Sequence, residues 1–325
     1  MLHSLHRRGV LAGMLALPSL ALAQTAENWP RRPIRVVVPY APGGAMDSST
    51  RVISDKLGAA LGQSIVIENR TGGSGTVGGS NVAQSAPDGY TFMAEGVPSL
   101  INPFTLRNIA FDYNTAFTPV TQVTRLPLAL AVKTDLPARS VAEFIALAKG
   151  RRESLSCGHS GNGTAAHLVG VLLQRGAGIT LNELPYRGGA DAVRDLASGT
   201  LDCATVALLS VASLAESGRA RILAVSSARR TPLMPDLPTL VESGVPDAVI
   251  EEWMGFYAPA GTPQPVIDRF QAAVATVLRD PEVTRRLAQL GAEPVGSSPA
   301  EFGAFVQRGR ADAEKLVREA KIEVN

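Results

Sequence analysis

The glycine loop Pro42–Gly44 has the clearest potential for ligand chemistry, because it joins a short apolar run to the start of a helix. Val36–Val38 is β-branched and too short for a helix, so it predicts a buried strand. Asp47 or Ser48 supplies the cap of a helix that Gly62 ends. A strand, a glycine loop and a helix N-terminus in this order predict an anion site, since free N–H groups and the positive end of the helix dipole face the loop. A tight turn without a ligand gives the same local pattern.

The same order of features occurs a second time in the chain. Leu155–Cys157 predicts a strand, Gly158–Gly163 a glycine loop, and Thr164 the cap of a second helix. Ligands of open parallel sheets bind beyond the carboxyl ends of the strands, and small-molecule sites favour the space between domains. The two loops are therefore predicted to face each other across a cleft, where two helix N-termini clamp a ligand with two negative ends.

A serine and two histidines near the second loop allow a different interpretation, an exported serine hydrolase. The run Gly158–Gly161 places Ser160 beside His159, and it departs from the nucleophile pattern G-x-S-x-G only at Asn162. Catalysis by such a pair needs a third group that orients the histidine, and no aspartate is placed beside His159 or His167. His167 is then interpreted as a helix residue near the cleft, and hydrolysis remains an alternative.

A second alternative is an exported dinucleotide-dependent oxidoreductase. Residues 73–78 match G-x-G-x-x-G, and Glu95 ends the next predicted strand, where an acid that binds ribose belongs. The first glycine of that fingerprint follows its strand directly, but here residues 69–72 intervene. We therefore expect no cofactor.

Histidines and cysteines show no spacing typical of a metal site, so no metal is expected. The two cysteines, Cys157 and Cys203, fit either buried thiols or a single disulfide.

Predicted strands and helices alternate along the chain, which indicates an α/β protein. The roughly 300 residues that follow the signal are more than a single hydrophobic core usually contains, so two lobes are expected. Phe117–Lys133 is extended and contains two prolines, and Trp253–Ala258 is a second extended run; both suit strands that cross between lobes.

We expect residues 24–122 and 253–325 to form the first lobe and residues 123–252 the second. Further strands are predicted at 64–68, 90–94, 181–184, 201–206 and 222–226, a loop at 95–103, and helices at 141–151, 190–198, 210–217, 266–278, 281–290 and 299–320.

The first 23 residues predict a secretory signal peptide. Arg7-Arg8 is followed by the uncharged apolar run Val10–Leu22, which is too short to span a bilayer, and Ala21–Ala23 is a cleavage site. Cleavage after Ala23 would deliver a periplasmic protein, by the general or the twin-arginine export route. It would also leave 29 basic and 29 acidic residues. This balance argues against nucleic-acid binding.

Several segments, in order along the chain, resemble the Bug family, the periplasmic solute receptors of tripartite tricarboxylate transporters. The resemblance covers nearly the whole exported chain. It is carried by Val38–Asp47 (VPYAPGGAMD), Glu68–Gly79 (ENRTGGSGTVGG), Ala86–Tyr90, Ser160–Thr164 with His167, Pro185–Gly189, Leu223–Ser227, Pro235–Thr239 and Trp253–Pro263.

The resemblance implies a two-lobed periplasmic binding protein of type II, each lobe a mostly parallel sheet flanked by helices, and not an enzyme. It implies that a small carboxylate is held between the lobes by main-chain groups and ordered water, for uptake by membrane transporter subunits that the receptor contacts transiently. We expect a monomer, and the sequence does not select the carboxylate. The sequence departs from the family pattern at Leu100, beside Ser99, because family members commonly have polar residues in this loop. The expected ligand-binding residues are Tyr40, Ala41, Pro42, Gly43, Gly44, Asp47, Ser99, Ser160, Gly161, Asn162, Gly163, Thr164, His167 and Tyr186.

Overall fold

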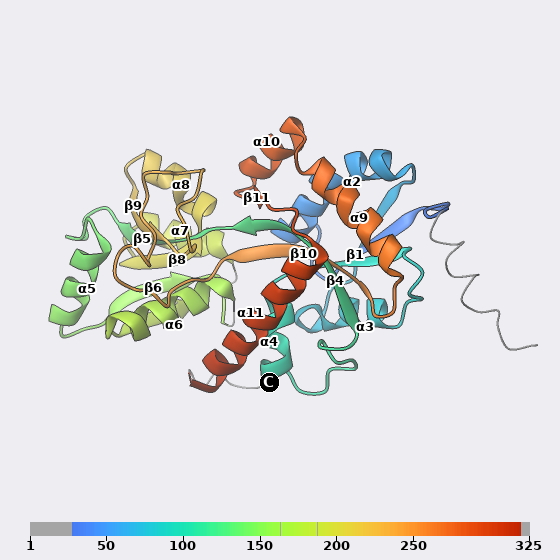
Figure 1. The fold of residues 1–325 in the computed structure, drawn as a ribbon. Coiled ribbons are helices and arrows are strands. Elements are labelled where there is room, and N and C mark those ends of the chain that lie inside the picture. Colours follow the sequence, from blue (N-terminus) through green and yellow to red (C-terminus); the bar gives the residue numbers. More distant parts are fainter. Residues whose placement is uncertain (1–27, 163, 187, 320–325) are drawn as a thin grey trace, which may run out of the picture.

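Two β-sheets, each covered by helices on both faces, lie side by side in the computed structural model (Figure 1). The structure describes residues 28–162, 164–186 and 188–319. The expected signal peptide and Gly163 lie outside this part of the chain. The architecture is the α/β, two-lobed one that the sequence predicts.

The first sheet has six strands in the order β11-β4-β10-β3-β1-β2. Strand β1 is parallel to β2 and β3, whereas β10 is antiparallel to β3 and β4. Its elements are β1 (Ile34–Val38), α2 (Ala45–Leu61), β2 (Ile65–Asn69), a 3-10 turn (Gly73–Gly75), α3 (Thr76–Ala83), β3 (Thr91–Glu95), α4 (Pro98–Thr105), β4 (Phe117–Leu126), β10 (Glu252–Pro259), α9 (Gln264–Val277), α10 (Pro281–Gln289), β11 (Glu293–Pro294) and α11 (Pro299–Glu319).

The second sheet has five strands in the order β7-β6-β8-β5-β9. Strand β6 is parallel to β7 and β8, whereas β5 is antiparallel to β8 and β9. Its elements are β5 (Leu128–Lys133), α5 (Val141–Gly150), β6 (Leu155–His159), α6 (Ala165–Ala177), β7 (Leu181–Pro185), α7 (Gly189–Ala197), β8 (Cys203–Ala207), α8 (Leu208–Glu216) and β9 (Ala220–Val225).

The two strand–loop–helix units occupy equivalent places, because β1 and β6 each lie between two parallel neighbours. Both sheets are mixed rather than mostly parallel. The reason is that β10 and β5, which lie next to the parallel strands, run antiparallel to their neighbours.

The chain passes from the first sheet to the second at Pro127, between β4 and β5, and returns through β10, which runs across the middle of Figure 1. The expected boundary at residue 122 falls inside β4, which stays paired with β10 as far as Leu126. We propose that the first lobe ends at Leu126 and resumes at Glu252.

Alternating side chains of β1 reach two different cores, as expected for a strand covered on both faces. Val36 and Val38 pack in the cluster that contains Ile53 and Leu57 of α2. Val37 packs in the cluster on the other face, which also contains Phe302 of α11. The glycine loop therefore extends from a strand that is fixed on both sides.

One local prediction differs from the structure, and one strand was not predicted. Residues 95–103 were expected to form a loop, but α4 begins at Pro98, because proline fits the first turn of a helix, where its missing N–H is not needed. The short strand β11 has only two residues and no sequence pattern of its own.

Cys157 and Cys203 are register partners on β6 and β8, and both are buried free thiols. No helix of the described residues is both long and apolar enough to cross a bilayer.

Candidate functional site

The buried carboxylate of Asp47 fixes the loop after β1 through a hydrogen bond. Asp47 is 1% exposed, and its Oδ2 accepts hydrogen bonds from the Gly43 N–H at 2.8 Å and from Arg51 Nε at 2.9 Å. Its Oδ1 accepts from Asn69 Nδ2 at 2.9 Å. These bonds, led by the one from Arg51, lower the Asp47 pKa to about 2 even though burial opposes ionisation. Asp47 therefore positions the loop, and its own oxygens are already occupied.

The N-terminus of α2 is open, although a side-chain cap was expected. The helix begins at Ala45, its N-cap is Gly44, and no described side chain caps it. The cap prediction was wrong because Asp47 lies inside the first turn and bonds backward to Gly43. Residues 41–44 are all exposed. An uncapped helix N-terminus under an exposed loop leaves N–H groups and the positive dipole end available to an anion.

Tyr40 and Glu95 form a hydrogen-bonded pair beside this loop. The Tyr40 hydroxyl donates to Glu95 Oε1 at 2.5 Å, and the Gly96 N–H donates to the same oxygen at 2.9 Å. Glu95 is fully buried and its Oε2 has no hydrogen-bond partner among the described residues. Burial raises the Glu95 pKa to about 7, and burial together with Glu95 raises the Tyr40 pKa. Glu95 is thus buried and hydrogen-bonded inside the first lobe. It does not present its carboxylate to a ribose, as the glycine motif would require.

Ser99 and Asn102 lie on α4, next to the same region. Ser99 is 1% exposed and its hydroxyl donates to the Gly96 carbonyl at 2.7 Å. Asn102 Nδ2 donates to the Ser74 carbonyl at 2.9 Å. Both side chains therefore support the loops that surround the candidate site.

The loop after β6 has its own capped helix. Thr164 is the N-cap of α6 as predicted, with its Oγ1 accepting from the His167 N–H at 3.3 Å. Ser160 Oγ donates to Thr164 Oγ1 at 3.2 Å, and Asn162 is exposed. Gly161 has φ +127°, a conformation that favours glycine. This geometry gives Ser160 a structural hydrogen bond within the loop.

Tyr186 lies against the same loop. Its N–H donates to the His159 carbonyl at 2.9 Å, and a Cβ on Gly161 would lie 3.4 Å from its carbonyl oxygen. Its hydroxyl donates to Asp195 Oδ2 on α7 at 2.8 Å, so burial and this contact raise the Tyr186 pKa. The structure thus brings Tyr186 next to Ser160–Thr164, with its hydroxyl directed to α7.

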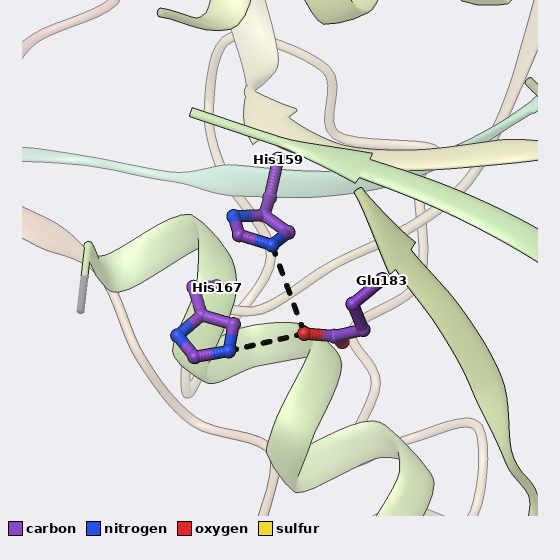
Figure 2. Close-up of side chains that lie close together, drawn as sticks. All are labelled: His159, His167 and Glu183. Carbon is purple, nitrogen blue, oxygen red and sulfur yellow. Dashed lines mark ion pairs between the residues drawn. The ribbon is translucent and has the colours of Figure 1, made fainter. Parts of the chain in front are cut away.

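A cluster that sequence spacing missed lies under the second loop (Figure 2). His159 Nε2 lies 3.8 Å and His167 Nε2 3.1 Å from the same oxygen, Glu183 Oε2. The two imidazole rings are stacked with centroids 4.6 Å apart. His159 is 1% exposed, and burial lowers its pKa. The prediction of no metal-ligand group was made from spacing alone, and it missed this group because its members come from β6, α6 and β7.

Glu252 of β10 connects the two loop regions. Its carboxylate lies near the Ala165 N–H at the start of α6, and its charge raises the pKa of Glu95 and Tyr40. Burial raises the Glu252 pKa itself to about 7. The N-terminus of α6 in the second lobe therefore lies near the Tyr40–Glu95 pair of the first. Glu252 was not a sequence candidate, and only the pairing of β10 with β3 and β4 brings it here.

The chain is similar to known receptors in sequence and in fold. A family model described as the tripartite tricarboxylate transporter family receptor matches residues 49–322. The periplasmic binding protein BugD is 32% identical, with a TM-score of 0.73 over 91% of this chain and 99% of that one. An R. palustris protein solved with adipate is 37% identical, with a TM-score of 0.77 over 91% and 99%. MatC from Rhodopseudomonas palustris, solved with malate, is 30% identical, with a TM-score of 0.71 over 89% and 100%.

Proposed function

The chain belongs to the tripartite tricarboxylate transporter family of receptors, and from this premise we propose that it binds a small carboxylate between its two lobes. Two relatives of similar fold were solved with the dicarboxylates adipate and malate, which supports a small carboxylate as the ligand. We propose the loops at Tyr40–Gly44 and Ser160–Thr164 as the places where its oxygens bind.

The observation that carries this proposal is the open N-terminus of α2. Helices normally begin with a side-chain cap, but here the cap position is Gly44 and the nearest carboxylate, Asp47, is used to fix the loop instead. The N–H groups of the first turn are then left for an external anion. Glu252 supports the view that both loops belong to one site, because its carboxylate lies near the Ala165 N–H at the start of α6 and its charge raises the pKa of Glu95 and Tyr40 in the first lobe.

We propose that the protein is a receptor and does not catalyse hydrolysis. Ser160 donates to Thr164, while His167 Nε2 faces Glu183 at 3.1 Å. Ser160→Ala should therefore leave most of the affinity for a carboxylate, losing about 1 kcal/mol if its hydroxyl makes one hydrogen bond to the ligand. Calorimetry on wild type and variant measures this loss. Turnover of an ester panel that depends on Ser160 would contradict the proposal.

Receptors of this family are periplasmic. We propose that this chain reaches the periplasm by cleavage after Ala23, works as a monomer, and delivers its ligand to membrane subunits of a transporter. Mass spectrometry of protein recovered from the periplasm should give a mass that begins at Gln24. A chain that retains Met1 would show that this export signal is not processed as proposed.

A further inference from the structure

We propose that His159, His167 and Glu183 form a binding site for one divalent transition-metal ion, best suited to zinc. The three side chains each offer a ligand atom, and these atoms all lie within 4.8 Å of one another. Two imidazoles and one carboxylate, with a further position for water, are a ligand set that zinc accepts. The ligand set does not depend on the carboxylate site proposed above.

His159 can adopt the hydrogen bonding expected of a metal ligand. Its Nδ1 lies 3.1 Å from the Gly161 carbonyl oxygen and 3.3 Å from the Gly161 amide nitrogen. In the tautomer that donates Nδ1–H to the carbonyl, the lone pair is on Nε2, and this is the form that a metal ion would select. That Nε2 is buried and has no hydrogen-bond partner within the described part of the chain. Figure 2 shows that it points toward Glu183 Oε2. In that tautomer, two electron-rich atoms are directed at one place, and a cation between them would stabilise both.

Glu183 is held in position by two features of α6. Gln174 Nε2 donates to Oε1 at 2.9 Å, which leaves Oε2 for the histidines. Gly170 lies above the carboxylate, and a Cβ there would come within 2.3 Å of Oε1. Positions 167, 170 and 174 share one face of the helix, so a single helix face supplies a ligand, the space for the carboxylate, and its orienting hydrogen bond.

A metal at this place would join both ends of the second loop. His159 precedes Ser160–Thr164 and His167 follows it, while Glu183 belongs to the neighbouring strand β7. Such a cross-link would restrict the loop motion, and this consequence rests on the proposed function of the loop. Metal binding itself can be measured without any carboxylate, so the two proposals can fail separately.

The test uses the exported protein, purified without a histidine tag and treated with EDTA, and titrated with zinc chloride by calorimetry. Two of the four histidines in the sequence are at positions 3 and 6, inside the expected signal peptide, so NMR of the imidazole nitrogens reports on His159 and His167 alone. We expect one saturable equivalent of zinc and a shift of both imidazole signals. Absence of saturable binding, or zinc uptake that moves neither imidazole, would overturn the proposal.

Two variants test the geometry without removing a histidine. Glu183→Gln keeps the shape of the side chain and should lower zinc affinity by more than about 100-fold. Gly170→Ala favours the helix but displaces the carboxylate, so it should also weaken binding. Glu153→Gln, at an exposed position before β6, is the matched control and should bind like wild type. Undiminished affinity in both Glu183→Gln and Gly170→Ala would refute the site.

Discussion

Gly44→Val should abolish carboxylate binding while the protein remains folded. Gly44 has φ −70° and ψ 166°, which valine adopts readily, and a Cβ there would meet no atom closer than the Ala41 carbonyl at 3.4 Å. Valine is a poorer N-cap than glycine, which costs the fold about 1 kcal/mol or less. Its branched side chain would nevertheless stand over the open N–H groups of α2, where the anion is proposed to bind.

The control for this variant is Gly150→Val at the end of α5. A Cβ at Gly150 would have open space around it, so the same chemical change is made far from both loops. Calorimetry should show undetectable binding for Gly44→Val and wild-type affinity for Gly150→Val, with matching circular dichroism spectra. Equal affinity in both would mean that the loop after β1 is structural only.

The free energy of unfolding should fall as pH rises from about 5 to about 8, because Glu95 is buried. Its pKa is raised from 4.5 to about 7 in the folded protein, mainly by burial. The folded state then binds more protons than the unfolded state across this window, so stability is present below the unfolded pKa and lost as pH passes 7. The shift corresponds to a loss on the order of 3 kcal/mol.

Glu95→Gln isolates this effect, because glutamine can still accept hydrogen bonds from Tyr40 and from the Gly96 N–H. Urea unfolding at several pH values should give a flatter profile for the variant than for wild type. Glu252, whose pKa burial also raises to about 7, titrates in the same window but is present in both proteins, and groups with lowered pKa, such as Asp47, act at lower pH. Glu153→Gln should keep the wild-type profile. Parallel profiles for wild type and Glu95→Gln would show that Glu95 is ionised in the folded protein at neutral pH.

Local features of the chain were predicted well because their causes are local. The strand at 36–38, the helix that Gly62 ends and the Thr164 cap all depend on neighbouring residues, and the structure confirms each of them. The alternation of strands and helices and the length of the chain were enough to predict two α/β lobes. The resemblance to a receptor family then supplied the function, which no spacing in the sequence could provide.

The features that sequence missed depend on pairing between distant segments. Glu252 approaches Glu95 only because β10 returns to the first sheet and pairs with β3. The histidine–glutamate cluster requires β6 and β7 to be in register and α6 to lie over them. Asp47 could be identified from sequence, but its role changed, since its bond to Gly43 fixes the loop and leaves the helix end open.

The central claim is that this receptor recognises the negative charge of a small carboxylate, and thermal unfolding with matched ligands tests it most directly. Adipate and malate are the first probes, each compared with its neutral diamide of the same length. A carboxylate at 100 times its Kd should raise the free energy of unfolding by about 2.7 kcal/mol, and the diamide should have no effect. The same stabilisation by the diamide, or none by any member of a broad carboxylate panel, would contradict the account.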